Sequence, residues 1–371
     1  MQLKSLSVTN FKNIEQGSFQ FSEKLNCLLG NNGMGKSNLL DAIYYLSFCK
    51  SFTGAQDGLV IRRGEDFMIM QGRYERRGAD EEINVSLGGG RRKTFKRSGK
   101  EYKRLSSHIG LFPAVLVSPS DMDLVSGGGE ERRRFIDMII SQGDAQYLDH
   151  LIRYNHNLQQ RNKLLRDGVN DRMLFLAIET AMDMSARYIT ESRRRIIERL
   201  AEIHRRYYSA IAGEDAEETG MEYRSALENE EGLSMLDLFE RNRTRDSLLK
   251  FTSTGPHRDD ILLTLSSMSV RQTASQGQQK TYTIALRLAQ YEFLSEWTGL
   301  KPLLLLDDIF DKLDARRVEA IISVVADDKF GQIFITDTNR KHLDEILSHI
   351  PAAHALWTVK DGVFTQTEVL Q

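Results

Sequence analysis

Polar and apolar residues alternate over the first 21 positions of the chain, and a short apolar run follows. Alternation with a period of two is typical of half-buried β-strands, so the pattern predicts two short strands over 1–21. The run Leu25–Leu29 predicts a buried strand. Helical spacing then predicts a helix after Ser37, through the apolar positions Leu39, Leu40, Ile43, Leu46 and Phe48. The chain therefore opens with a strand, a glycine-rich loop and a helix.

The remainder of the chain changes character twice. Residues 66–117 combine short apolar stretches with several glycine turn signals, which predicts a mainly β region. From residue 130 to about 250 prolines disappear, and charged, helical patterns dominate. Strands and helices then alternate, with strands predicted over 261–270, 302–306 and 332–336 and helices over 278–294 and 316–325.

This order predicts an α/β fold with an insertion. We interpret residues 1–128 and 251–371 as one sheet-containing lobe, and 129–250 as an inserted α-helical lobe. The helical block is too short for the long coiled-coil arms of chromosome-condensation proteins, so no long coiled coil is expected.

Composition narrows the class of protein. The chain has 371 residues, 40% of them hydrophobic, and a formal net charge of -2, so a strongly basic protein that coats nucleic acid by charge alone is excluded. Cys27 and Cys49 form no CxxC pair and are expected to be buried, reduced thiols. No signal peptide is visible, and the apolar run around Leu303–Leu306 is too short to span a bilayer. We expect a cytoplasmic protein without a membrane partner.

The segment 30–37, called here the glycine loop, carries the clearest chemistry. It matches the pattern G-x-x-x-x-G-K-[ST], in which backbone N–H groups and a helix N-terminus surround phosphate groups. Lys36 would contact the β- and γ-phosphates and Ser37 would bind Mg²⁺. A plain flexible turn is the alternative, but the position between a strand and a helix favours nucleotide binding by Gly30, Asn31, Asn32, Gly33, Met34, Gly35, Lys36, Ser37 and Asn38.

Two carboxylates end the apolar strand predicted at 302–306. Asp307 would hold Mg²⁺, and Asp308 would orient or deprotonate the attacking water, which makes Asp308 and Lys36 the catalytic candidates. The alternative is an ordinary acidic turn or helix cap. Because the glycine loop is present as well, we favour the catalytic interpretation.

A polar segment, 275–280, precedes a predicted amphipathic helix about thirty residues before the acidic strand. Ser275, Gly277 and Gln278 stand where a helix N-terminus would attract an anion, although a glutamine-rich helix cap gives the same pattern. The order of glycine loop, long insertion, this signature segment and acidic strand resembles ABC-type ATPase heads. That resemblance implies a sheet core with an antiparallel β subdomain. It also implies an ATP-induced homodimer, in which ATP on one copy's glycine loop is capped by the signature segment of the other.

Further blocks resemble the RecF family, and they cover nearly the whole chain. They are Leu6–Asn13, Gly33–Ile43, Lys50–Phe52, Leu124–Gly128, Arg132–Asp137, Thr254–Asp260 and Ser275–Lys280. Some positions depart from that pattern. Lys12 stands where the family often has arginine, Gly129 and Glu130 replace a proline-containing version, and residues 117–121 are the candidate for a missing glutamine loop. The stretch Ile335–Thr338, with its two threonines, occupies the region of the transporter switch histidine, and this predicts slow hydrolysis.

The resemblance implies an ATP- and Mg²⁺-dependent protein of recombinational repair. Its dimer would clamp DNA at gaps or single-strand/duplex junctions, hydrolyse ATP weakly with DNA stimulation, and help load recombinase with RecO- and RecR-like partners. A link to the SOS response, replication and the nucleoid is also implied. The alternatives are a nucleotide-gated DNA-binding module with negligible turnover, or another SMC-like or ABC head.

Two basic clusters are candidate DNA contacts, although each is equally typical of a solvated face. The first contains Arg91, Arg92, Lys93, Lys96, Arg97, Lys100, Lys103 and Arg104, and the second contains Arg193, Arg194, Arg195, Arg199, Arg205 and Arg206. His257 and Arg258 are interpreted as residues that pin a tight turn, with DNA or nucleotide contact as the alternative. Tyr154 and Asn155 are interpreted as candidate surface features of the helical lobe.

Overall fold

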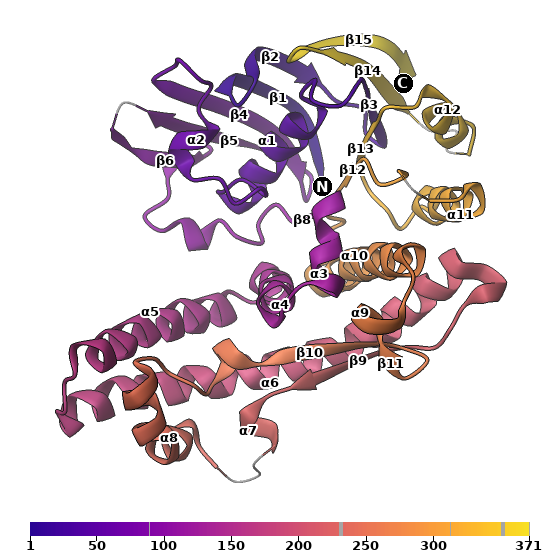
Figure 1. Ribbon diagram of the computed structural model, residues 1–371. Helices are drawn as coiled ribbons and strands as arrows, with labels where there is room; N and C mark the ends of the chain where they lie inside the picture. The colour runs from indigo at the N-terminus through magenta and orange to yellow at the C-terminus, as the bar shows by residue number, and fades with distance from the viewer. Residues whose placement is uncertain (89, 230–232, 312, 350–352, 371) are drawn as a thin grey trace. The chain divides into compact units, whose positions relative to one another are not determined.

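The computed structural model describes residues 1–88, 90–229, 233–311, 313–349 and 353–370 (Figure 1). Its packing groups the chain into two units. The first contains 1–121, 210–213 and 287–371, and the second contains 122–209 and 214–286. The sequence-based boundary at 251 differs from this division, because residues 251–286 pack with the second unit through the pairing of β10 (Asp260–Leu265) with β9 (Thr219–Arg224).

An antiparallel sheet in the first unit has the strand order β2-β1-β4-β5-β6-β7. Its strands are β1 (Gln2–Phe11), β2 (Ile14–Gln20), β4 (Phe67–Arg76), β5 (Ala79–Gly88), β6 (Arg91–Arg97) and β7 (Lys100–Glu101). Alternation places one face in the core: Met68 and Met70 of β4 are buried, whereas Phe67 and Ile69 are exposed. The N-terminal strands and the strands between residues 67 and 101 thus form a sheet with one buried face.

The second sheet of this unit has the order β15-β14-β3-β13-β12-β8 and is parallel except at β15. Its strands are β3 (Leu25–Leu29), β8 (Ala114–Val117), β12 (Leu303–Asp307), β13 (Ile333–Asp337), β14 (His354–Lys360) and β15 (Val363–Leu370). Strands β12 and β13 are buried along their whole length, as expected of central parallel strands covered on both faces. The carboxyl ends of β3, β12 and β13 therefore meet at one edge.

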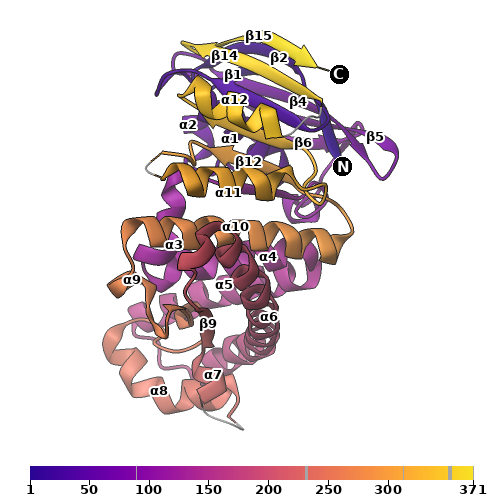
Figure 2. The same ribbon diagram turned by 90° about the vertical axis from the view of Figure 1, so that its right-hand side faces the viewer.

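Helices of the first unit flank these sheets (Figures 1 and 2). They are α1 (Lys36–Phe48), α2 (Asp57–Val60), α11 (Ala315–Ala326) and α12 (Arg340–His349), with a 3-10 turn at Leu105–Ser107 and another at Pro119–Met122. α1 is buried on nearly every side, which explains why its sequence is apolar around the helix. The side chain of Gln332 joins the two sheets by bonding both the N–H and the carbonyl of Leu3, at 2.8 and 2.9 Å.

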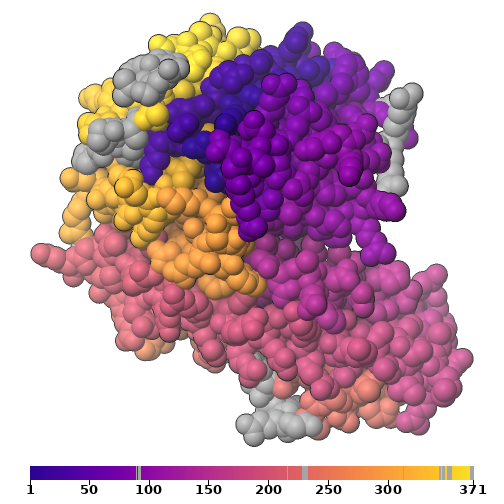
Figure 3. Space-filling view, turned by 180° about the vertical axis from the view of Figure 1, so that it is seen from behind, coloured from indigo at the N-terminus to yellow at the C-terminus, as the bar shows by residue number. Residues whose placement is uncertain are grey.

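The second unit is mostly helical and contains a three-stranded sheet of order β11-β10-β9. Its elements include α3 (Asp123–Ser126), α4 (Gly129–Gly143), α5 (Ala145–Asp167), most of α6 (Arg172–Ala212), α7 (Ala226–Asn229), α8 (Met235–Leu249), α9 (Val270–Thr273) and β11 (Met268–Ser269), with a 3-10 turn at Pro256–Arg258. The end of α6 and the start of a 3-10 turn at Gly213–Asp215 belong to the first unit. α10 (Gln276–Thr298) begins in the second unit and ends in the first. In Figure 3 the rose-coloured residues of α6 extend along the surface of this unit.

The longest helix of the described residues is α6, with 41 residues, so the described fold has no long coiled coil. Strand β9 lies inside the block that the sequence predicts as helical. It forms because β10 offers an edge with which it pairs residue by residue. Within the described ranges, no helix has the length and apolar content that a membrane crossing requires.

Candidate nucleotide-binding site

The glycine loop connects β3 to α1 and curls tightly over the sheet edge. Gly35 has a φ of 111°, in the region that favours glycine, and a Cβ at this position would lie 2.7 Å from the side-chain amide of Asn13. A Cβ at Gly30 would lie 2.5 Å from the carbonyl oxygen of Val359. These close approaches explain the glycines at both ends of the motif.

Two hairpin turns hold the loop from outside. Asn13, in the turn between β1 and β2, donates to the carbonyl of Met34 at 3.2 Å and accepts from the Asn38 side chain at 2.6 Å. The backbone N–H of Gly362, between β14 and β15, also donates to the Met34 carbonyl, at 2.8 Å. Neither support is predicted from the sequence above, although the Asp361-Gly362 pair is a recognisable hairpin signal.

Lys36 is buried inside the loop, where its side chain contacts the backbone. Its Nζ donates to the carbonyls of Gly30 and Asn31 at 2.6 and 3.0 Å. Burial lowers the pKa of Lys36, and the nearby carboxylates of Asp308, Asp307 and Asp337 act in the opposite direction. The ammonium group is therefore already in the loop, and phosphate oxygens are stronger acceptors than these carbonyls.

The carboxyl end of β12 meets the start of α1. The Ser37 hydroxyl donates to Oδ1 of Asp307 at 2.8 Å, and the hydroxyl of Thr336 on β13 donates to the same oxygen at 2.8 Å. Thr336 Oγ1 in turn accepts the backbone N–H of Asp308 at 2.9 Å. Burial raises the pKa of Asp307, while the two hydroxyl hydrogen bonds favour its charged form.

The donor set at this point fits a Mg²⁺ ion. A serine hydroxyl and a carboxylate oxygen are hard oxygen ligands, and they already converge on each other. Ser37 and Asp307 would hold the ion, whose charge would neutralise that of the phosphates. Asp308 is half-buried, adopts a φ of 49°, and lies beside them at the strand end.

A buried acidic residue joins three of the sequence blocks. Asp41 of α1 is fully buried and forms an ion pair of 2.6 Å with Lys12. It also accepts hydrogen bonds from the Ser51 hydroxyl at 2.6 Å and the Phe52 N–H at 2.8 Å. In this structure Lys12 therefore binds a carboxylate of α1, the helix that follows the glycine loop.

The segment 117–121, which was the candidate for the glutamine loop, is held in place by hydrogen bonds and an ion pair. Asp121 accepts the Ser118 N–H at 2.9 Å and forms a two-pronged pair with Arg287, at 3.0 and 2.5 Å. Both partners are buried. Asp121 is the last residue before the chain leaves the first unit, and Arg287 belongs to the segment that returns to it.

The signature residues belong to the second unit and lie at the start of α10. Ser275 and Gln278 form a reciprocal cap: the Ser275 N–H donates to Gln278 Oε1 at 2.8 Å, and the Gln278 N–H donates to Ser275 Oγ at 3.2 Å. The amide of Gln278 also donates to Glu217. Gly277 lies in this half-buried first turn, and Ser275 is exposed.

Several candidate DNA-contact residues have structural roles. Arg193 is 2% exposed and pairs with Asp137, and Lys93 pairs with Asp57. The side chains of Arg91 and Arg92 lie outside the described residues. Exposed members of the clusters are Lys96, Lys100, Lys103, Arg104, Arg194, Arg195, Arg199, Arg205 and Arg206.

In the turn that contains His257 and Arg258, one side chain is held by hydrogen bonds and the other is exposed. His257 uses both ring nitrogens, contacting the Tyr154 hydroxyl at 2.8 Å and the Thr252 carbonyl at 3.0 Å. Tyr154 is 1% exposed, so its assignment to the surface was wrong: its ring fills the space beneath this turn. Arg258, by contrast, is exposed.

The fold and the site together define an ABC-type ATPase head, with glycine loop, acidic strand and signature helix on the expected elements. The family model described as the RecF/RecN/SMC N terminal domain matches residues 2–355. The DNA replication and repair protein RecF of Parabacteroides distasonis is 51% identical over 362 residues, covering 98% of each chain. The chain belongs to the RecF family.

Other relatives agree. RecF of Porphyromonas gingivalis is 44% identical over 367 residues, covering 99% of this chain and 100% of its own. The solved structure of the recombination mediator protein RecF-ATP in the RecFOR pathway has a TM-score of 0.88 at 29% identity, covering 99% of this chain and 97% of that chain. An Smc head bound to the C-winged helix domain of ScpA, 14% identical, shares the fold with a TM-score of 0.61.

Proposed function

We propose that the glycine loop binds ATP, with Lys36 on the terminal phosphates and Ser37 and Asp307 on Mg²⁺. The observation that carries this proposal is the 2.8 Å hydrogen bond between Ser37 and Asp307, beside a lysine already held inside the loop. The name of a solved relative, RecF-ATP, supports the choice of nucleotide. Loop residues Asn31, Asn32 and Gly33 are exposed and accessible to a ligand.

ATP would join two copies of the chain. Ser275, Gly277 and Gln278 form the N-terminus of a long helix, where backbone N–H groups attract anions. In the proposed dimer this helix end of one copy faces the triphosphate on the glycine loop of the other. Each ATP would then contribute to the interface, and the dimer would form only with the triphosphate bound.

The ATP-bound dimer would clamp DNA at gaps or single-strand/duplex junctions in the cytoplasm, at the nucleoid. The curated relatives are named DNA replication and repair proteins, and the solved relatives are placed in the RecFOR pathway. We propose the corresponding role here: helping to load recombinase with RecO- and RecR-like partners, in the SOS response and in replication maintenance. Contact with the DNA backbone, rather than base reading, would provide the affinity.

Turnover is proposed to be slow and stimulated by DNA, with Asp308 as the residue that orients or deprotonates water. Thr336 cannot take up a proton as a histidine does, and its hydroxyl is engaged by Asp307 and by the N–H of Asp308. This engagement also favours the second candidate, a nucleotide-gated DNA-binding module with negligible turnover. Phosphate release measured with DNA separates the two. If the wild type releases phosphate, and Asp308→Asn stops that release while still binding DNA, the ATPase is supported.

The whole proposal is tested on one sample. Association state and DNA affinity are measured with ATP, with ADP and without nucleotide, at two salt concentrations. The proposal predicts a dimer and tight DNA binding only with ATP, and weaker binding at higher salt. Equal DNA affinity in all three nucleotide states would contradict it.

A further inference from the structure

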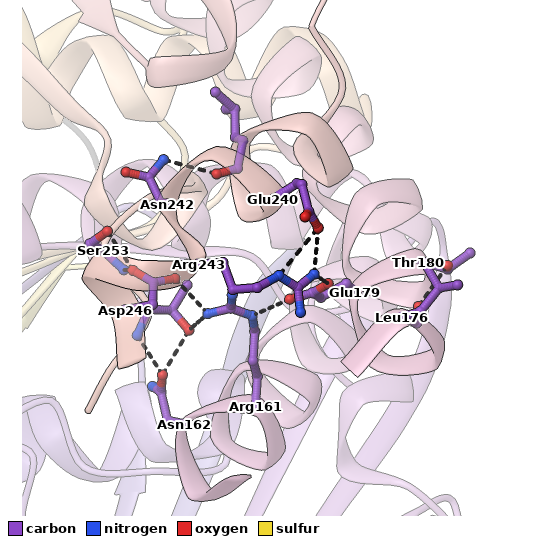
Figure 4. A network of polar contacts seen from close by, with 12 residues as sticks. Arg161, Asn162, Leu176, Glu179, Thr180, Glu240, Asn242, Arg243, Asp246 and Ser253 are labelled. Carbon is purple, nitrogen blue, oxygen red and sulfur yellow. Dashed lines mark hydrogen bonds and ion pairs between the residues drawn. The ribbon is translucent and has the colours of Figure 1, made fainter. Parts of the chain in front are cut away.

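The loop 251–260, between α8 and β10, is held by many hydrogen bonds from mostly buried side chains. Arg161 of α5 is 1% exposed and holds the start of this loop (Figure 4). It donates to Glu179 at 2.9 Å, to Asp246 at 2.7 Å and to the hydroxyl of Thr252 at 2.9 Å. Two acidic residues and a loop hydroxyl therefore surround one buried guanidinium.

Neighbouring side chains extend this network along the loop. Oδ1 of Asp246 accepts from the N–H of Ser253 at 2.9 Å and from its hydroxyl at 2.6 Å. Asn162 accepts the N–H of Thr252 at 2.7 Å. The His257 ring then bridges from the Thr252 carbonyl to Tyr154.

Three further arginines fix the second half of the loop. Arg193, buried, donates to the carbonyl of Pro256 at 2.7 Å. Arg133 donates to the carbonyl of Asp259 at 2.6 Å, and Arg132 forms a two-pronged pair with Asp260 at 2.8 and 2.9 Å. The loop backbone is thus held along its length before any ligand arrives.

Only two side chains of this loop are exposed, and they contact each other. Phe251 is 37% exposed, and the guanidinium carbon of Arg258 lies 5.0 Å from its ring centroid. In the described part of the chain no carboxylate pairs with Arg258. The same holds for Lys250, an exposed residue that directly precedes Phe251 in the sequence. Arg153, another exposed arginine of the same unit, differs: it pairs with Asp149 at 2.8 Å.

We propose that Arg258, stacked on Phe251 and assisted by Lys250, contacts the DNA backbone. The inference rests on the proposed DNA-binding function and names residues for it. A planar guanidinium suits phosphate oxygens, and its stacking on an aromatic ring leaves the edge donors available. Protein surfaces that bind nucleic acid typically combine unpaired cationic side chains with aromatic rings. The rigid loop lowers the conformational entropy that binding would otherwise cost.

The test measures binding of the full chain, with ATP and Mg²⁺, to a fluorescent duplex with a single-stranded overhang. Arg258→Ala is predicted to weaken binding roughly three- to tenfold, alike for unrelated DNA sequences. It should also lower the slope of log affinity against log salt by about one per contacting copy. Arg258→Lys should lose less, because it keeps the charge. ATP-dependent dimerisation is measured in parallel and should not change.

Arg153→Ala is the matched control, since it removes an exposed arginine of the same unit that already has a partner. Its DNA affinity should stay close to that of the wild type. If Arg258→Ala keeps wild-type affinity and salt slope while the wild type binds DNA, the inference is overturned and an acidic protein becomes the better ligand for this pair. If the wild type itself does not bind DNA with ATP, the proposed function fails first.

Discussion

The hydroxyl of Ser37 lies 2.8 Å from Oδ1 of Asp307, although 270 positions separate the two residues in the chain. Ser37 stands in the first turn of α1 and Asp307 ends β12, so the two elements meet at the carboxyl edge of the parallel sheet. The two residues that connect the glycine loop to the acidic strand are therefore the same two that are expected to bind Mg²⁺.

Ser37→Ala should remove the Mg²⁺-dependent part of ATP binding, because the carboxylate of Asp307 alone leaves the ion one protein ligand short. Ser37→Thr keeps the hydroxyl and should retain that part. Calorimetric titration of ATP with and without Mg²⁺ measures the difference. An unchanged Mg²⁺ dependence in Ser37→Ala would remove this residue from the proposed metal site.

Thr336→Val should destabilise the first unit. The substitution keeps the shape of the side chain but leaves the N–H of Asp308 without its acceptor and the buried Asp307 without one donor. Losses of this kind cost about 1–3 kcal/mol. Urea unfolding measures the change, with Thr336→Ser as the control that retains the hydroxyl. Equal stability of the valine variant and the wild type would mean that these hydrogen bonds contribute little.

Arg161→Met should destabilise the second unit by about 3–5 kcal/mol, because Asp246 would remain buried without a cation and Glu179 would keep only Arg243, at 3.8 Å. The exposed Arg153→Ala should change the free energy of unfolding by no more than about 0.5 kcal/mol. Chemical unfolding of the three proteins tests the prediction. A loss below about 1 kcal/mol for Arg161→Met would show that the lobe relaxes and admits water.

Three histidines with lowered pKa values predict acid sensitivity. Burial lowers the pKa of His108 and of His257 to about 4 and that of His204 to about 3, so the folded chain holds them neutral. The unfolded chain binds their protons near pH 6.5, and stability therefore falls as pH drops from about 6.5 toward 4. Each histidine should contribute on the order of 1 kcal/mol per pH unit within this window.

Thermal or urea unfolding between pH 7 and 5 measures this dependence. His204→Gln removes one titrating group, and its stability should change less steeply with pH than that of the wild type. A wild-type stability that is flat from pH 6.5 to 5 would contradict the prediction. The carboxylates are not expected to hide the effect, because most of them remain ionised above pH 5.

Much of the first unit follows from local patterns in the sequence. The run Leu25–Leu29, the glycine loop and the helix after Ser37 have strong, short-range signals, and the structure forms β3 and α1 at those positions. The same holds for β12 and α11. Parallel strands buried on both faces are continuous apolar runs, which makes them easy to find.

Features that depend on distant partners were not visible. β9 needs the edge of β10, because its alternation, Met221-Glu222-Tyr223-Arg224, is too short to predict a strand inside a helical block. The roles of Asn13 and Asp121 depend on neighbours brought together by the fold. Arg193 looked like one more cation on an arginine-rich helix. Only its position on the buried face of α6, opposite Asp137, separates it from Arg194 and Arg195.

The central claim is that triphosphate is held between two copies, Lys36 of one and the turn at Gly277 of the other. The most direct measurement is sedimentation velocity with ATP and Mg²⁺ on Lys36→Ala, on Gly277→Asp, and on an equal mixture of the two. The account predicts that each variant alone stays monomeric. The mixture should form dimers, because pairing the two variants rebuilds one complete site. A Gly277→Asp protein that dimerises like the wild type, or a mixture that stays monomeric while the wild type dimerises, would contradict it.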